Sequence, residues 1–205
     1  MTDRLGELAL APGMTIDHVI EWRPRVWGPA VASALSAGMP LEGKRVLELG
    51  PRSGRISALL AFNGARVLGA ELPGTDMTGA QAEVARWGVD DRVEFTHYSG
   101  DPSDLPDGPF DLVVSKSVLV VVPELPKFFE AISDRLGDGG SLVCAENRRG
   151  GAVMKSLRRL KGHHWAESDR FSGVGSEFMA ALDSSFTEVD VLYRNPMVCA
   201  IRAHN

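Results

Sequence analysis

The sequence predicts an α/β protein built on a doubly wound, mostly parallel sheet with helices on both faces. Two observations lead to this prediction. From residue 45 onward, short apolar runs typical of buried strands alternate with segments typical of helices. The last two strands are joined by a turn too short for a crossover, so they must be antiparallel. The length of 205 residues, with 44% apolar and 24% charged residues, suits one folded domain.

Seven strands are expected in chain order, each a short apolar run bounded by turn residues. A seven-stranded sheet that is mostly parallel, with one antiparallel strand near the C-terminus, follows from their connections. The strands are Arg45–Leu49, Arg66–Glu71, Arg92–Tyr98, Phe110–Ser115, Ser141–Glu146, Thr187–Tyr193 and Met197–Arg202.

Helices are expected before and between these strands. Residues 16–37 predict two helices with a kink, because Pro24 and Gly28-Pro29 interrupt the apolar pattern. Ser53 is the expected N-cap of the helix after the first strand, and Asp76 that of a helix over 77–87. Two further helices are expected over Pro123–Leu136, stopped by the glycines from Gly137 to Gly140, and over Ser176–Leu182.

The pattern divides the chain into an N-terminal helical cap segment, residues 1–40, and a main domain, residues 41–205, with a basic insert at 147–170. The two cysteines, Cys144 and Cys199, lie in apolar strands and predict buried thiols in a reducing cytoplasm. The longest apolar run, Val118–Val122, is too short to span a bilayer, and no secretory signal is expected. The net charge of −5 argues against a dedicated nucleic-acid binder.

The strongest functional signal is Val46-Leu-Glu-Leu-Gly-Pro-Arg-Ser-Gly54, a buried strand running into a glycine turn and a helix N-terminus. Glycines let the backbone approach a ligand, and a helix start presents free N–H donors. Glu71 ends the second strand, where an acid can accept hydrogen bonds from ribose hydroxyls. Asp101, after the third strand, can accept from an adenine amine. The structural alternatives are a tight strand-to-helix turn for the glycine segment, a surface acid at a strand end for Glu71, and an Asp-Pro turn for Asp101.

These motifs resemble the class I S-adenosylmethionine-dependent methyltransferases from about residue 40 to the C-terminus. The resemblance rests on VLELGPRSG (46–54), VLGAEL (67–72), SGDPSDLP (99–106), FDLVVSKSVL (110–119) and LGDGGSLV (136–143). It implies S-adenosylmethionine as cofactor and S-adenosylhomocysteine as product. The cofactor-binding residues that it implies are Glu48, Gly50, Arg52 and Gly54 around the methionine, Glu71 with Leu72 at the ribose, Asp101 with Pro102 at the adenine, and Ser115 near the methyl group.

Two positions depart from the family pattern. Arg52 stands where the glycine turn should have its middle glycine, so its side chain either crowds the cofactor or swings outward and leaves the backbone contact intact. Pro102 follows the adenine-site acid and has no N–H to donate, which leaves that contact to a neighbour such as Ser103.

The acceptor site is expected from the variable segments. One is the N-terminal segment with His18, Trp22 and Trp27; the other is the insert, whose basic residues face away from an apolar helical stripe and suggest either an electropositive lid or a solvated helix. Trp87 and Trp165 are further stacking or core residues, and Lys116 is a substrate contact or a loop lysine. The general-base candidates are His163, His164 and His18, because histidine titrates near neutrality; a structural role is the alternative for each.

Together these signals predict a methyltransferase acting on a small-molecule acceptor, anionic or aromatic in character, with an O-methyl product and no metal. The alternatives are an RNA methyltransferase using the 148–164 face, and a catalytically silent scaffold that binds a partner. A nicotinamide-dependent reductase fits less well, because the third glycine of its Gly-x-Gly-x-x-Gly turn is missing after Gly50.

Overall fold

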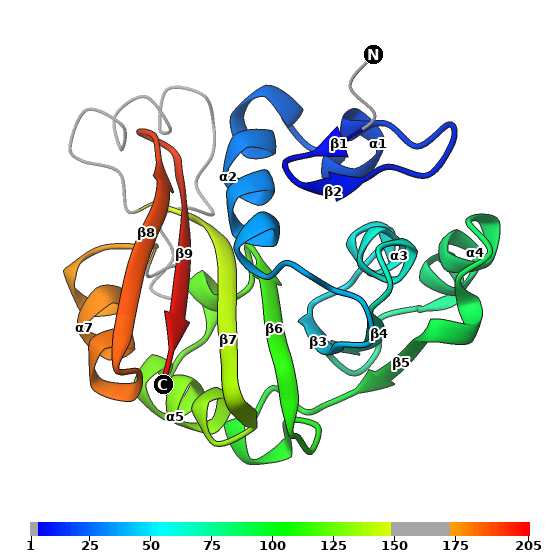
Figure 1. Ribbon diagram of the computed structural model, residues 1–205. Coiled ribbons are helices and arrows are strands. Elements are labelled where there is room, and N and C mark those ends of the chain that lie inside the picture. Colours follow the sequence, from blue (N-terminus) through cyan, green and yellow to red (C-terminus); the bar gives the residue numbers. More distant parts are fainter. Residues whose placement is uncertain (1–3, 149–172) are drawn as a thin grey trace.

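The computed structural model describes residues 4–148 and 173–205, and its centre is a seven-stranded sheet. The strand order is β5-β4-β3-β6-β7-β9-β8, and Figure 1 shows the strands in this order across the molecule. β9 pairs antiparallel with both β7 and β8, and the other pairings are parallel, which confirms the expected sheet. The strands are β3 (Arg45–Leu49), β4 (Arg66–Glu71), β5 (Val93–His97), β6 (Phe110–Lys116), β7 (Leu136–Asn147), β8 (Glu188–Arg194) and β9 (Val198–His204).

Helices cover both faces of the sheet, so its central strands are buried on both sides. Alternate residues of one strand enter opposite cores: Val46 packs in one cluster and Leu47 in the other. The first core lies under α1 (Ile16–Ile20), α2 (Pro24–Ala37) and α3 (Arg55–Phe62), with α4 (Thr78–Arg86) beside α3. The second lies under α5 (Leu125–Ser133) and α7 (Ser176–Ser185).

Of the two expected interruptions before the sheet, the one at Pro24 is present. The chain leaves α1 after Ile20 and begins α2 at Pro24, a favourable first helical residue. Gly28-Pro29 does not interrupt α2, contrary to the prediction. Pro29, which cannot donate to the carbonyl of Arg25, is exposed, as is Arg25. A short hairpin, β1 (Arg4–Leu5) with β2 (Leu8–Ala9), was not predicted.

Three local predictions need correction. Ser53 does not cap α3: Gly54 precedes the helix, and the Ser53 hydroxyl donates to Glu21 instead. The helix expected to reach Leu136 ends at Ser133, and β7, expected from Ser141, already begins at Leu136 and includes the glycines; its pairing with β6 shifts register between Phe110 and Leu112. Asp76 is not the N-cap of α4: Met77 holds that position, although the Asp76 carboxylate accepts the N–H of Thr78, the first residue of the helix.

Short 3-10 helices complete the connections: η1 (Asp90–Arg92), η2 (Pro102–Asp104) and η3 (Leu119–Val121). Cys144 and Cys199 are free and buried on β7 and β9. Within the described ranges, no helix has both the length and the apolar character needed to cross a membrane. The basic insert at 147–170 falls almost entirely outside the described residues, and the division at residue 40 stays a prediction.

Candidate active site

A cavity of about 690 Å³ opens at the carboxyl ends of the central strands, within the size range of small-molecule sites. Ligands of open α/β sheets bind at this edge. Residues from β3, β4, β6 and β7 reach it, and the α1–α2 connection forms its roof. The lining is Glu21, Trp22, Trp27, Glu48, Gly50, Pro51, Arg52, Ser53, Ile56, Glu71, Lys116, Ser117, Val118 and Asn147.

A larger hollow of about 910 Å³ lies at the opposite edge. It is lined by Arg45, Arg66 and Val93, the first residues of β3, β4 and β5. This is the amino edge of the parallel sheet, where neither the glycine turn nor the strand-end acids lie. We therefore take the carboxyl-edge cavity as the candidate site.

The turn after β3 depends on left-handed backbone conformations. Gly50 has φ 68° and Gly54 has φ 73°, a region that glycine enters without steric cost. A Cβ on Gly50 would lie 2.5 Å from Cγ2 of Val118, and one on Gly54 would lie 2.8 Å from the carbonyl oxygen of Ala80. Both glycines therefore make close packing of the turn possible. Gly50 lines the cavity, whereas Gly54 lies behind it, against α4.

Arg52 takes the left-handed conformation of the glycine it replaces, with φ 47°. Its side chain is exposed and its backbone N–H donates to Glu71 at 3.1 Å. Arg52 also belongs to the cavity lining, so the choice between a side chain that crowds the cofactor and one that swings outward stays a prediction.

Glu71 is the last residue of β4 and lines the cavity as expected. Its two carboxylate oxygens accept the N–H groups of Arg52 and, at 3.0 Å, of Leu72. The acid therefore ties the β4 end to the glycine turn. Leu72 itself is 48% exposed and is not part of the lining.

Glu48 is a buried acid whose side chain still borders the cavity. It accepts a hydrogen bond from the Ser57 hydroxyl on α3. Burial raises the pKa of the Glu48 carboxyl to about 7, against the opposing effects of Ser57 and the Lys116 ammonium. Glu48 is thus poised to change charge near neutrality.

The expected adenine-site residues lie away from this cavity. Asp101 and Pro102 begin η2, and neither belongs to the lining. The Asp101 carboxylate accepts both the N–H and the hydroxyl of Ser103, at 2.8 and 2.6 Å, and these bonds lower its pKa. The Ser103 N–H, the substitute adenine donor considered above, is therefore already used.

Ser115 lies below the cavity rather than on its surface. It is buried and its hydroxyl donates to Glu146 at 2.8 Å. The two residues that follow it, Lys116 and Ser117, reach the lining instead. The expectation for this strand end is thus displaced by one residue.

The histidine candidates receive no support. The His18 ring contacts the Glu83 carboxylate and packs edge-on against Trp87, so it faces α4 and not the cavity. Its environment is that of a structural histidine. His163 and His164 lie outside the described residues.

The residues that sequence reasoning missed include Glu21 and Asn147, which line the cavity, and Glu146, which is buried next to Asn147. Glu21 has φ 61°, accepts from the Ser53 hydroxyl at 2.9 Å and lies 3.6 Å from the Arg55 guanidinium. Asn147, the last residue of β7, donates to the Ser117 hydroxyl at 2.8 Å. A polar residue ending an apolar strand was the available signal for Asn147.

Glu146 is fully buried beside the cavity floor. One carboxylate oxygen accepts from Ser115 and from the N–H groups of Val118 and Leu119, at 3.2 and 3.1 Å. Burial raises its pKa to about 7. The acid therefore fixes the path from β6 into η3, which no sequence pattern indicated.

The fold and the cavity define a doubly wound α/β protein with a ligand site at its carboxyl edge, and the comparisons with known proteins specify the class. Residues 19–181 match the model of a methyltransferase domain family. The chain is 36% identical over 126 residues to the demethylmenaquinone methyltransferase of Clavibacter sepedonicus, covering 60% of this chain and 47% of that protein. It is 29% identical over 171 residues to the protein-L-isoaspartate O-methyltransferase of Methylorubrum populi, covering 82% and 71%.

The fold is shared with a solved S-adenosylmethionine dependent methyltransferase from Mesorhizobium loti, with a TM-score of 0.62, 22% identity, and coverage of 86% of this chain and 98% of that one. The chain therefore belongs to the methyltransferase domain family, and the expected class I S-adenosylmethionine-dependent type is confirmed. It spans about half the length of the Clavibacter relative, 47%.

Proposed function

We propose that this protein transfers the methyl group of S-adenosylmethionine to a small-molecule acceptor and forms an O-methyl product. The observation that supports this most directly is that Glu71 and the glycine turn line the same cavity as polar groups from β6 and β7. One cavity thus offers a donor half and an acceptor half. The O-methyl product draws support from the similarity to the Methylorubrum relative, which is an O-methyltransferase.

The donor half lies over β3 and β4. Glu71 would accept hydrogen bonds from the ribose hydroxyls, and the ionised Glu48 carboxylate would attract the ammonium of the methionine part. Some of the expected donor contacts lie outside the cavity lining, namely Gly54, Leu72, Asp101, Pro102 and Ser115. These residues could contact the donor only if the site changed conformation. When bound, the donor supplies an electrophilic methyl group on a sulfonium.

The chain's own contribution is placement and exclusion of water. Methyl transfer is an in-line displacement, so the acceptor atom must be held on the far side of the methyl carbon from the sulfur. The roof, which Arg55 fixes by donating to the His18 carbonyl at 2.8 Å, covers this space. Ser117 and Asn147 offer hydrogen bonds on the acceptor side.

Calorimetric titration with S-adenosylmethionine, S-adenosylhomocysteine and NADPH tests the donor. We expect the two sulfur ligands to bind with dissociation constants on the order of 1 μM and NADPH not to bind. Failure of both sulfur ligands to bind a folded, ligand-free sample would refute the proposal and favour the silent-scaffold alternative. A large gain in donor affinity on Arg52→Gly would show that the native turn is impaired.

Transfer of a labelled methyl group then tests the acceptor class. Label that enters a small organic acceptor supports the proposal, whether the product is a methyl ether, which is stable to alkali, or a methyl ester, which alkali hydrolyses. Label that enters protein instead would point to a protein substrate, as for the protein-L-isoaspartate O-methyltransferase of Methylorubrum populi.

A further inference from the structure

The acceptor half of the cavity holds a half-buried lysine, Lys116, at the end of β6. Its Nζ donates to the Ile20 carbonyl at 3.2 Å and lies 5.8 Å from the centre of the Trp27 ring. Among the ion pairs of the described residues, none involves Lys116. Within the described part of the chain, Lys116 is therefore a cavity-lining cation without an ion-paired carboxylate, and such a cation is a ready site for an anion.

The charges that face Lys116 come from four elements around it. Glu21 in the roof and Glu48 on β3 favour the ammonium, whereas Arg52 in the turn and Arg55 on α3 oppose it. Burial is the largest influence and lowers the pKa of Lys116. An anionic group bound next to the ammonium would offset this burial.

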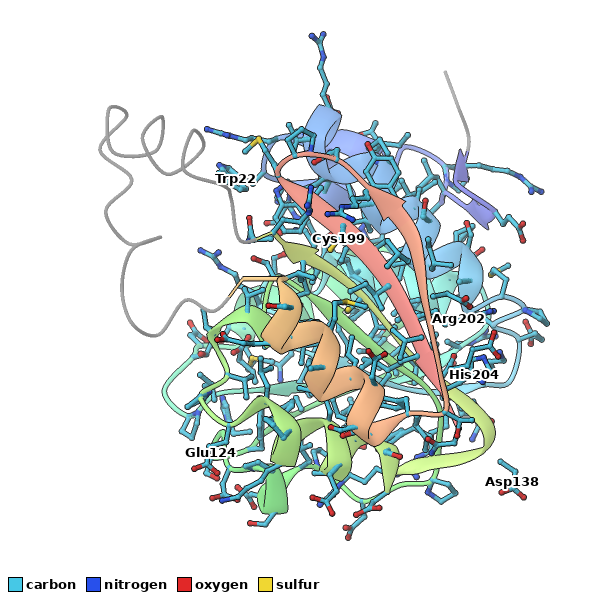
Figure 2. The ribbon with its side chains drawn as sticks, turned by 90° about the vertical axis from the view of Figure 1, so that its left-hand side faces the viewer. Trp22, Glu124, Asp138, Cys199, Arg202 and His204 are labelled. Carbon is cyan, nitrogen blue, oxygen red and sulfur yellow. The ribbon has the colours of Figure 1, made fainter. Side chains whose placement is uncertain are left out.

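An aromatic wall stands beside this cation. Trp22 is 46% exposed and lines the cavity, while Trp27 behind it is 1% exposed. Their ring centres lie 6.4 Å apart, with planes tilted by 50°. Figure 2 shows Trp22 at the surface, near the end of the sheet where β7 finishes. An exposed indole face in a cavity suits stacking of a planar ring.

The backbone on either side of Trp22 is strained. Glu21 and Arg23 have φ 61° and φ 48°, which non-glycine residues seldom adopt. Such conformations persist where surrounding contacts hold them, and they concentrate at functional sites. Here Glu21 is held by Ser53 and Arg55, and the Arg23 guanidinium lies 4.8 Å over the Trp22 ring. Contacts of the flanking residues thus hold a strained backbone that places Trp22 in the cavity lining.

The position of Lys116 relative to Glu71 separates acceptor from donor. Glu71 ends β4 and Lys116 ends β6, with β3 between them. Two strand spacings amount to about 10 Å. A ribose at Glu71 therefore leaves the Lys116 end for the acceptor, next to the turn expected around the methionine part.

We infer that Lys116 and Trp22 form the acceptor subsite, and that it takes a planar aromatic molecule whose hydroxyl reacts as an oxyanion. This inference rests on the proposed function. None of the lining residues that the structure describes is a histidine. The Lys116 ammonium would stabilise the ionised hydroxyl, whose proton leaves to solvent before transfer.

The transfer step then balances. A lone pair of the phenolate oxygen forms the bond to the methyl carbon, and the carbon–sulfur bond breaks with its electron pair going to sulfur. The sulfonium becomes a neutral thioether and the phenolate becomes a neutral ether. Lys116 remains protonated throughout, and no oxidant or reductant is needed.

The test uses 4-nitrophenol, a planar phenol whose ionised form is yellow, with the protein saturated by S-adenosylhomocysteine. We expect the wild type to bind the phenolate and to lower the apparent pKa of the bound probe. Lys116→Gln keeps a donor for the Ile20 carbonyl but removes the charge, and it should weaken probe binding about tenfold or more and abolish that pKa shift. Lys116→Arg should retain the shift.

Trp22 gives an independent arm of the same test. Trp22→Ala should weaken probe binding while leaving the pKa of the remaining bound probe lowered, and Trp22→Phe should restore much of the affinity.

Binding of S-adenosylhomocysteine to each variant separates the two proposals. If the wild type fails to bind S-adenosylhomocysteine, the proposed function fails. If the ligand binds normally but 4-nitrophenol does not bind, or binds equally well to Lys116→Gln, the acceptor subsite is overturned and the proposed function stands.

Discussion

Glu71 is engaged before any ligand arrives. Its oxygens accept two backbone N–H groups, one from the glycine turn and one from its own strand end. A carboxylate offers about four acceptor positions, so two ribose hydroxyls can share it. The same side chain can therefore shape the turn and read the sugar.

Replacing Glu71 with alanine should weaken S-adenosylmethionine binding by about 1.5–3 kcal/mol, because hydrogen bonds to a charged group are lost. Calorimetry on Glu71→Ala measures this directly. Asp101→Ala is the matched comparison, since Asp101 is an exposed acid after β5 that does not line the cavity. Unchanged affinity in Glu71→Ala would contradict its assignment, and an equal loss in Asp101→Ala would place the adenine over η2.

Glu48 should make donor binding depend on pH. With its pKa raised to about 7, the carboxyl is largely neutral below that pH and attracts the donor ammonium less. Affinity for S-adenosylmethionine should therefore rise as pH increases through about 7. Titrations across this range with Glu48→Gln as control should show the rise only in the wild type; the same rise in both proteins would assign it to another group.

At the scale of elements, the start of α3 depends on close contact with α4. A Cβ at position 54 would lie 2.9 Å from the Ala80 Cα as well as near its carbonyl oxygen. Gly74 has a comparable positive φ of 86° but nothing within 4 Å. An alanine at position 74 would therefore meet only the strain of a positive φ, whereas an alanine at position 54 would also clash with α4.

Gly54→Ala should destabilise the fold by about 1–3 kcal/mol more than Gly74→Ala, because only the former adds overpacking to the left-handed strain. Chemical denaturation of both variants gives the difference. Equal losses would mean that α4 moves away at little cost, and that the glycine at 54 is needed only for its backbone conformation.

For the whole molecule, two buried acids connect stability with pH. Glu48 and Glu146 have folded-state pKa values of about 7, above the ordinary 4.5 of the unfolded chain. Between these values the folded protein binds more protons than the unfolded one. Stability must then fall as pH rises from about 4.5 to about 7.

Denaturation curves across this range should show the fall, and Glu146→Gln should reduce its slope by about half, since one of the two acids is gone. Asp76, Asp101 and Asp104 have lowered pKa values and act on stability below 3.8, outside the window. If the stability of the wild type instead rises between pH 4.5 and 7, Glu48 and Glu146 ionise freely in the folded state.

The architecture could be predicted from the sequence because apolar runs and connection lengths define it locally. The seven strands, the helices on both faces and the antiparallel β9 follow from such patterns. Sequence patterns indicated Glu48, Gly50, Arg52 and Glu71 near strand ends, and Trp22 and Trp27 in the N-terminal segment; all six line the cavity. Glu21, Asn147 and Glu146 depend on contacts between distant segments, and His18 was misleading because its partner, Glu83, lies 65 positions away.

The roof over the cavity has a consequence for how the protein is made. It comes from the beginning of the chain, yet Lys116 fixes the Ile20 carbonyl across 96 positions. Closing so long a loop costs entropy that local contacts do not repay, and contacts of high sequence separation slow folding. During synthesis the roof segment emerges before β6 and must wait until β6 has left the ribosome. Ligand-binding competence should therefore arrive late in the life of the nascent chain.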